Sequence, residues 1–269
     1  MTRAELVKQI FEKQSFLCVG LDPDLEKIPN HLLESENPVL EFNKAIIEAT
    51  APYCVAYKPN LAFFEALGEQ GMQTFYETLK YIPKSHFVIA DAKRGDIGNT
   101  SKKYAEAFFE KFACDALTIA PYMGSDSVQP FLGEAGKWAV LLVLTSNQGA
   151  DDFEQLLLAN GKKLYEEVMD RAMEWGSADE LIFVVGATRP EQLKMLRKRA
   201  PGYFFLIPGV GAQGGNLAEV AEAALTKDCG ILVNASRSIL YASNGIDVAE
   251  KASGEARALQ KEMAALLKM

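Results

Sequence analysis

The sequence has few residues of the kinds that metal sites and disulfide frameworks require. Its 269 residues include two histidines and four cysteines, and the cysteines are far apart, without a CxxC pair. Paired cysteine spacing is typical of zinc sites and small secreted domains, so neither is expected. His31 lies in a polar stretch and His86 begins an apolar run, so both are expected to be structural. The thiols are expected to be reduced and buried in the core: Cys18, Cys54, Cys114 and Cys229.

Long hydrophobic runs and a positive net charge are also lacking. The longest apolar run, residues 138–144, is far shorter than the ~20 residues of a membrane helix. Residues 1–6 carry charges where a signal peptide would be apolar. The chain has 28 Lys and Arg against 36 Asp and Glu, a formal charge of −8, which argues against nucleic acid as a partner. We expect a cytoplasmic protein without membrane or nucleic-acid contacts, in which a local cluster of donors holds any anionic ligand.

Eight apolar runs alternate with amphipathic helical patterns. The expected strands are residues 16–20, 53–57, 86–90, 115–119, 138–144, 181–185, 203–207 and 230–234. The expected helices include residues 38–50, 61–79 with a break at 68–71, 156–173 and 191–196. Continuously apolar strands alternating with helices indicate a parallel sheet, and eight units in this length predict a (β/α)8 TIM barrel. We expect one domain over residues 1–269, with extra helices at 4–13 and 248–267; a doubly wound open sheet is the alternative.

Polar residues follow nearly every predicted strand. They are Asp22, Lys58, Asp91 with Lys93, Thr118, Ser146, Thr188, Gln213 and Arg237. In such barrels the active site lies at the carboxyl ends of the strands. Strand ends also become polar simply because loops begin there, which is sufficient for Thr118 and Thr188. That explanation does not account for Lys58, which stands inside the run Val-Ala-Tyr-Lys-Pro-Asn.

The densest polar stretch is residues 91–100. Asp91 and Lys93 are two apart, so on an extended strand they project to the same side; if that side is the inside, they share a confined, poorly hydrated mouth. Asp96 and Thr100 are four apart at a predicted helix start, which places them on one face of the helix. A surface ion pair and a helix cap at Asp96 would explain either pair alone, but not the whole stretch.

A glycine-rich motif offers a rival function. Residues 209–214 spell GxGxxG with Asp228 further on, which suggests a dinucleotide-binding dehydrogenase. That fingerprint belongs to the first strand of its unit, whereas here it follows the seventh. In barrels the loops after strands 7 and 8 commonly bind phosphate, and Gln213 and Arg237 are suitable donors there. We therefore favour phosphate over NAD. The acidic stretch 151–154 fits either a solvated loop or a lid.

The string Asp91-x-Lys93-x-x-Asp96-Ile97-x-x-Thr100 resembles the signature of the orotidine 5′-phosphate decarboxylase family. Residues 19–23, 58–60, 208–210 and 234–239 also resemble motifs of that family, and the spelling of residues 92–95 and 120–124 resembles its second, bacterial subgroup. The resemblance implies decarboxylation of orotidine 5′-phosphate to UMP, the last step of de novo pyrimidine nucleotide synthesis. It also implies a reaction without metal or coenzyme.

The resemblance implies a role for each residue of the string. Lys93 would protonate the C6 carbanion, and Asp91 would lie beside the departing carboxylate. Lys58 would pair with Asp91 and hold Asp91 and Lys93 in place. Asp96, with Thr100 beside it, would enter the active site of the neighbouring subunit, which implies a homodimer.

Further residues would bind the rest of the nucleotide. By the same resemblance, Asp22 would accept hydrogen bonds from the ribose and Ser146 would bind the pyrimidine amide edge, while Gln213 and Arg237 would hold the phosphate. Two alternatives remain beside the dehydrogenase. Related barrels with a similar Asp-x-Lys-x-x-Asp string use magnesium on sugar-phosphate enediolates, and a nucleotide sensor would bind UMP without turnover.

Overall fold

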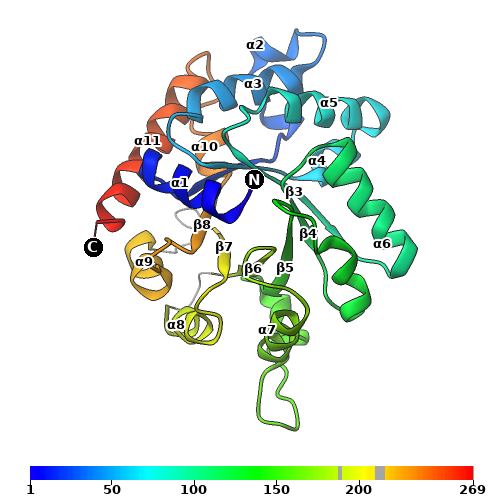
Figure 1. Cartoon of the computed structure of the whole chain (residues 1–269). Coiled ribbons are helices and arrows are strands. Elements are labelled where there is room, and N and C mark those ends of the chain that lie inside the picture. The colour runs from blue at the N-terminus through cyan, green and yellow to red at the C-terminus, as the bar shows by residue number, and fades with distance from the viewer. Residues whose placement is uncertain (187–189, 210–215, 269) are drawn as a thin grey trace. The chain divides into compact units, whose positions relative to one another are not determined.

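The computed structural model describes residues 1–186, 190–209 and 216–268. Strands and helices alternate along the chain (Figure 1). The strands are β1 (Leu17–Leu21), β2 (Ala56–Pro59), β3 (Phe87–Arg94), β4 (Ala116–Ile119), β5 (Trp138–Leu144), β6 (Leu181–Val185), β7 (Phe204–Pro208) and β8 (Ile231–Ala235). The α-helices are α1 (Arg3–Lys13), α2 (Asn30–Leu33), α3 (Pro38–Thr50), α4 (Leu61–Glu65), α5 (Gly68–Tyr81), α6 (Gly98–Ala105), α7 (Leu164–Trp175), α8 (Pro190–Arg199), α9 (Leu217–Ala224), α10 (Arg237–Leu240) and α11 (Val248–Leu266). Shorter helical turns are η1 (Leu25–Lys27), η3 (Ser125–Ser127), η4 (Gln129–Phe131) and η5 (Gln148–Asp152), and η2 (Glu106–Lys111) is a π-helix.

The strands form a closed barrel in the order β1 to β8. The pairs β1–β2, β2–β3, β4–β5, β5–β6 and β6–β7 are parallel. A closed parallel barrel with intervening helices is a (β/α)8 barrel, so the predicted fold is confirmed and the open doubly wound sheet is wrong. Contacts group the chain into two compact units, residues 1–3 with 93–233 and residues 4–92 with 234–269. The single domain over residues 1–269 stays a prediction.

In the unit of residues 1–3 and 93–233, β5 pairs with β4 on one side and β6 on the other. Nearly all of β5 is buried, and so is the whole of β6. Strands covered on both faces favour continuous apolar runs over alternation, and both strands have the bounds that the sequence predicts. Helices α7, α8 and α9 lie outside the strands of this unit (Figure 1).

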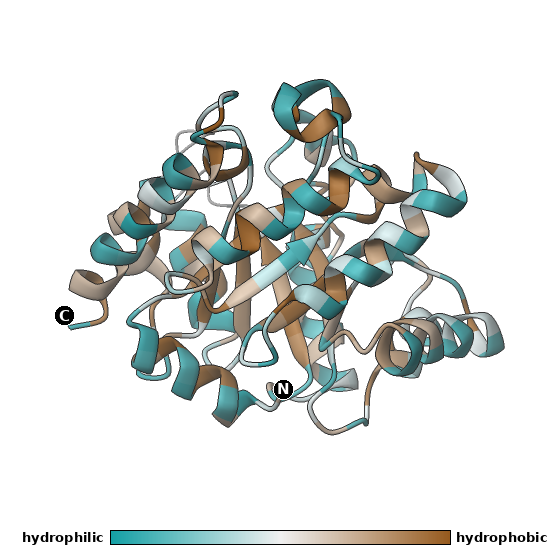
Figure 2. Ribbon diagram, turned by 90° about the horizontal axis from the view of Figure 1, so that it is seen from above, coloured by the Kyte–Doolittle hydropathy of each residue, from teal (hydrophilic) through white to brown (hydrophobic). Residues whose placement is uncertain are grey.

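In the unit of residues 4–92 and 234–269, α3 packs between α11 and α5. Its start is fixed locally, because the Asn37 side chain accepts a hydrogen bond from the Leu40 amide and Pro38 occupies the first turn. Its apolar face is buried and includes Phe42 and Ile46. Figure 2 shows helices that carry both hydrophobic and hydrophilic residues, and strands that are hydrophobic over much of their length.

The helix predicted over residues 156–173 begins eight residues too early. Residues 156–163 form a tight turn instead, in which Leu157 bridges Lys163 in antiparallel fashion and Gly161 has φ +81°. Helix α7 begins after Lys163, whose amide donates to the Glu166 carboxylate at 2.8 Å. Leu157 is 73% exposed, so the apolar residue that suggested a helical face is not part of the core. The predicted break at 68–71 is also displaced, since α5 begins at Gly68.

The four cysteines are free and buried, as expected. Among the described residues, no helix combines the length and the apolar content needed to cross a membrane.

Candidate active site

A buried ion pair joins β2 and β3. Lys58 Nζ donates to Asp91 Oδ2 at 2.6 Å, and the two residues are 6% and 8% exposed. The strand ends meet because Asn60 bridges Asp91 in parallel fashion. Burial lowers the pKa of Lys58, but the carboxylates of Asp91 and Asp22 raise it more, so its pKa lies above the ordinary value. Lys58 is therefore a buried ammonium, and the pairing with Asp91 predicted from the sequence is present.

Asp22 lies where β1 ends, beside the end of β8. Its backbone carbonyl accepts from the Tyr241 hydroxyl at 2.6 Å, and that hydroxyl accepts from the Asp24 amide at 2.8 Å. Within the described residues, the buried Oδ1 of Asp22 has no hydrogen-bond donor. The tyrosine thus fixes the backbone of this loop and leaves the carboxylate for another partner.

Lys93 departs from the extended strand that the sequence suggests. Its φ is +46°, in the left-handed region, although it lies within β3. Its amide donates to Thr118 Oγ1 of β4 at 2.8 Å, and the β3–β4 ladder continues with the Ala120 amide donating to the Arg94 carbonyl. The spacing argument assumes extended backbone, which Lys93 does not have, so alternation does not by itself place Asp91 and Lys93 on one side.

The burial of the two residues also differs. Asp91 is buried, whereas Lys93 is exposed in the single chain. Lys93 is therefore not enclosed by its own chain, and a dry mouth shared by both residues stays a prediction.

Asp96 and Thr100 do not share a helix face. Helix α6 begins at Gly98 with Ile97 as its N-cap residue, so Asp96 precedes the helix. Asp96 Oδ1 accepts instead from the Ile97 amide at 2.7 Å. Thr100 is exposed and Ile97 is 52% exposed. The stretch after β3 therefore presents both polar and apolar side chains outward.

Ser146 follows β5 and is half-buried. The carboxylate of Glu154 accepts from the amide and hydroxyl of the neighbouring Thr145, at 2.7 and 2.9 Å. These bonds return the chain after η5 to the end of β5. Glu154 is therefore an anchor of this segment and not part of a solvated loop, while Asp151 and Asp152 are exposed.

Arg237 is the first residue of α10, directly after β8, and its side chain is exposed. Among the described residues, no carboxylate forms an ion pair with it, so its guanidinium is suited to an external anion. Gln213, the other predicted phosphate ligand, lies outside the described residues, as do Thr188 and most of the GxGxxG motif. Asp228 pairs with Arg3 at 3.5 Å, before β8 begins.

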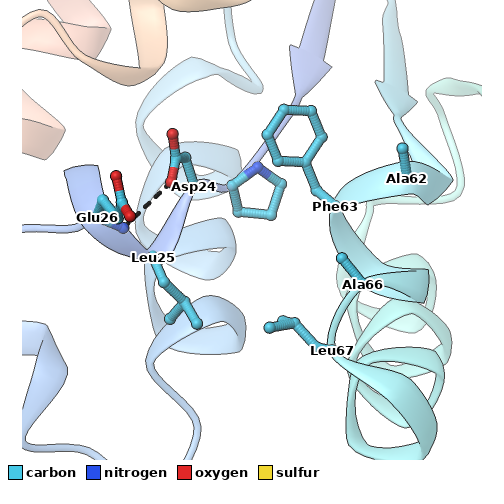
Figure 3. A pocket seen from close by; sticks show the side chains of 8 residues that line it. Asp24, Leu25, Glu26, Ala62, Phe63, Ala66 and Leu67 are labelled. Atoms are coloured by element: carbon cyan, nitrogen blue, oxygen red, sulfur yellow. Dashed lines mark hydrogen bonds between the residues drawn. The ribbon is translucent and has the colours of Figure 1, made fainter.

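A largely apolar groove of about 410 Å³ lies beside these strand ends, between the turn after β1 and helix α4 (Figure 3). Its lining is Pro23, Asp24, Leu25, Glu26, Ala62, Phe63, Ala66 and Leu67. Leu25 and Leu67 face each other across it (Figure 3). None of the site residues predicted from the sequence lines it. The described part of the chain contains no group of three or more His, Cys, Asp and Glu side chains placed to hold a metal ion.

The fold and these residues define a (β/α)8 barrel with charged side chains at its strand ends, the place where barrel enzymes carry their active sites. The family model "Orotidine 5′-phosphate decarboxylase / HUMPS family" matches residues 15–252. The chain therefore belongs to this family, and the resemblance found in residues 91–100 is confirmed.

Similar proteins cover nearly the whole chain. An orotidine 5′-phosphate decarboxylase of Parabacteroides distasonis is 53% identical over 99% of this chain and 96% of its own. One of Porphyromonas gingivalis is 55% identical over 98% and 96%. Among solved structures, the OMP decarboxylase of Leishmania donovani is 36% identical, with a TM-score of 0.81 over 97% of this chain and 99% of its own. These similar proteins are decarboxylases and not dehydrogenases, so the dehydrogenase alternative is wrong.

Sequence reasoning missed two polar contacts of the strand ends. The sequence gives no reason to treat Thr118 as more than an ordinary strand end, yet its hydroxyl accepts a hydrogen bond from the Lys93 amide. Asn234, the last residue of the predicted eighth strand, is 7% exposed and donates through Nδ2 to Ser236 Oγ at 3.2 Å. An asparagine that closes an otherwise apolar run was the available signal for the second.

Proposed function

We propose that this chain decarboxylates orotidine 5′-phosphate to UMP in the cytoplasm, as the last step of de novo pyrimidine nucleotide synthesis. Membership of the family supports the reaction class. The single observation that carries the proposal is the buried pair of Lys58 and Asp91, because Asp91 lies on the strand that also bears Lys93. A carboxylate held by one lysine and followed by a second is suited to a substrate that loses a carboxylate and gains a proton.

In the proposed reaction, the bond between C6 and the carboxylate breaks and CO₂ leaves. The electron pair remains on C6, and Lys93 transfers a proton to it. Asp91 lies beside the departing carboxylate, and Lys58 holds Asp91 in place. One proton donor supplies roughly 10²–10⁴-fold, whereas the most demanding reactions need more than ~20 kcal/mol of barrier lowering. Binding energy from the rest of the nucleotide must therefore help to position the ring.

The nucleotide is divided among the remaining residues. Asp22 accepts hydrogen bonds from the ribose, and Ser146 binds the amide edge of the pyrimidine. Arg237 and Gln213 bind the phosphate. The exposed guanidinium of Arg237 supports its part, because a bidentate fork suits phosphate in an otherwise acidic chain.

The test of the activity is turnover of orotidine 5′-phosphate followed by ultraviolet absorbance, with EDTA present. We expect full activity in EDTA, and for Lys93→Ala we expect UMP binding without release of CO₂. Lys84→Ala, which removes an exposed lysine just before β3, is the matched control and keeps activity. Loss of activity in EDTA would favour the magnesium-dependent alternative, and binding without turnover by the unchanged chain would favour the sensor.

We also propose a homodimer in which Asp96 and Thr100 complete the partner's active site. The exposure of Lys93, Ile97 and Thr100 in a single chain supports it, because a proton donor in contact with bulk water would lose much of its electrostatic effect. The test mixes subunits of Lys93→Ala with subunits of Asp96→Ala. Each mixed dimer then has one intact site of two. Because random mixing makes about half of the dimers mixed, roughly a quarter of the activity returns. No return of activity in verified mixed dimers would show that Asp96 acts within its own subunit.

A further inference from the structure

The carboxamide of Asn234 has one hydrogen-bonding group satisfied and the other left over. Its Nδ2 donates to Ser236 Oγ at 3.2 Å. Within the described residues, its Oδ1 is buried and has no donor. Because the carboxamide is planar, the bond to Ser236 fixes the direction in which Oδ1 points. A buried acceptor without a donor costs free energy, so this oxygen is expected to have a partner when the site is filled.

Oδ1 of Asn234 points over Gly20 of β1. A Cβ on Gly20 would lie 3.2 Å from this oxygen and 1.8 Å from Ser236 Oγ, so both side chains occupy the space that a larger residue would need. Gly20 is in register with Lys58 of β2, and aligned residues of paired parallel strands project to the same face. The oxygen therefore lies on the face of the sheet from which Lys58 projects.

A second buried acceptor lies nearby. Oδ1 of Asp22, two residues after Gly20, also lacks a donor within the described residues. The Asp22 carboxylate is near enough to Lys58 to raise the pKa of its ammonium. The strand ends of β1, β2 and β8 thus combine two acceptors with one ammonium.

This combination selects among the groups of a nucleotide. A phosphate dianion offers no proton, and two acceptors repel it. The pyrimidine N3–H is a single donor flanked by two carbonyl oxygens, which these acceptors also disfavour. A sugar hydroxyl both donates and accepts, so it can donate to Asn234 or Asp22 while it accepts from Lys58.

We propose that Asn234 is a substrate-binding residue whose Oδ1 accepts a hydrogen bond from a ribose hydroxyl, beside Asp22. The proposal rests on the proposed function only in taking the ligand as a ribonucleotide. Gly20 belongs to the same binding site, because only a residue without a side chain leaves room for the Asn234 carboxamide over β1.

The test measures binding of UMP, 2′-deoxy-UMP and 3′-deoxy-UMP by calorimetry to the full chain and to Asn234→Leu. For the unchanged chain, removal of one of the two hydroxyls weakens binding about tenfold. Asn234→Leu weakens UMP by the same factor, and removal of that hydroxyl then costs nothing further. Asn234→Asp keeps an oxygen at Oδ1, so the ratio between UMP and the deoxynucleotide persists even if its added charge weakens both.

Two results would overturn the proposal. One is equal weakening of all three ligands by Asn234→Leu, and the other is loss of the ratio in Asn234→Asp. Unfolding curves establish that each variant is folded, and Asn234→Ala supplies the same comparison if leucine does not fit. Because the readout is a ratio of affinities, it is independent of catalysis. A chain that binds UMP but does not decarboxylate would refute the proposed function and leave this test intact.

Discussion

Replacement of Lys58 by methionine separates the stability of the buried pair from its role in catalysis. Methionine keeps most of the lysine stem and removes the charge. With Nζ and Oδ2 2.6 Å apart, the Coulomb energy at an effective dielectric constant of 20 is about 332/(20 × 2.6), or ~6 kcal/mol. Removing each ion from water costs several kcal/mol, so the intact pair contributes little net stability.

The single variant is expected to be strongly destabilised, because it leaves the Asp91 carboxylate buried without its ammonium. Breaking such a pair lowers the free energy of unfolding by ~3–5 kcal/mol. The lone carboxylate can avoid the cost of a buried charge by taking up a proton in the folded state, which raises its pKa there. The folded variant then binds more protons than the unfolded chain, so its stability relative to the unchanged protein falls as pH rises. Asp91→Asn in the same background removes the buried charge and recovers most of the loss.

Urea unfolding followed by circular dichroism, at about pH 5 and about pH 8, measures both effects. Lys8→Met is the matched control, because Lys8 forms an exposed pair with Glu12 and its loss changes stability little. The double variant Lys58→Met/Asp91→Asn is expected to be stable and inactive. The reasoning is refuted if the double variant is no more stable than Lys58→Met, or if the loss is the same at both pH values.

Three further predictions concern contacts around the barrel. Thr118→Val removes the acceptor for the Lys93 amide and is expected to lower kcat about tenfold with little change in UMP affinity, whereas Thr118→Ser retains activity; equal kcat in both variants contradicts a positioning role. Burial and a neighbouring ammonium lower the pKa of His86 to about 4, so the unfolded chain binds the proton first and stability rises with pH between about 4 and 6.5; His86→Gln should flatten that part of a thermal-unfolding profile, and an unchanged slope would assign it to other groups. Gly20→Ala places Cβ 1.8 Å from Ser236 Oγ and is expected to cost roughly 1–3 kcal/mol; Ser236→Gly should relieve the clash, and strictly additive losses in urea would show that the two residues do not interact.

The fold was predictable because its strands are buried on both faces. Continuous apolar runs predicted β5 and β6 with their observed bounds, and the helical pattern of residues 38–50 predicted α3. The failure at residues 156–163 has the opposite cause. Leu156 and Leu157 are exposed, and apolar spacing indicates a helix only where the helix buries those residues.

Of the candidate site, the pairing of Lys58 with Asp91 was predictable, whereas the backbone geometry around Lys93 was not. Lys58 and Asp91 form the expected pair, because neighbouring parallel strands carry their ends to one edge. The conformation of Lys93 was not predictable, because the hydroxyl that holds its amide belongs to Thr118 on another strand. Asn234 was missed for the same reason, since its orientation depends on a glycine at the other end of the chain.

These misses share a physical origin, which also connects them to function. Lys93 adopts a backbone conformation that costs a non-glycine residue roughly 1–2 kcal/mol. Asn234 leaves a buried acceptor without a donor in the described part of the chain, and neither feature improves the stability of the chain by itself. Strained backbone and unsatisfied buried polar groups occur mainly at functional sites, where a ligand or a reaction offsets their cost in stability. Both departures lie near the carboxyl ends of their strands, Lys93 in β3 and Asn234 in β8, and they support the active site proposed above.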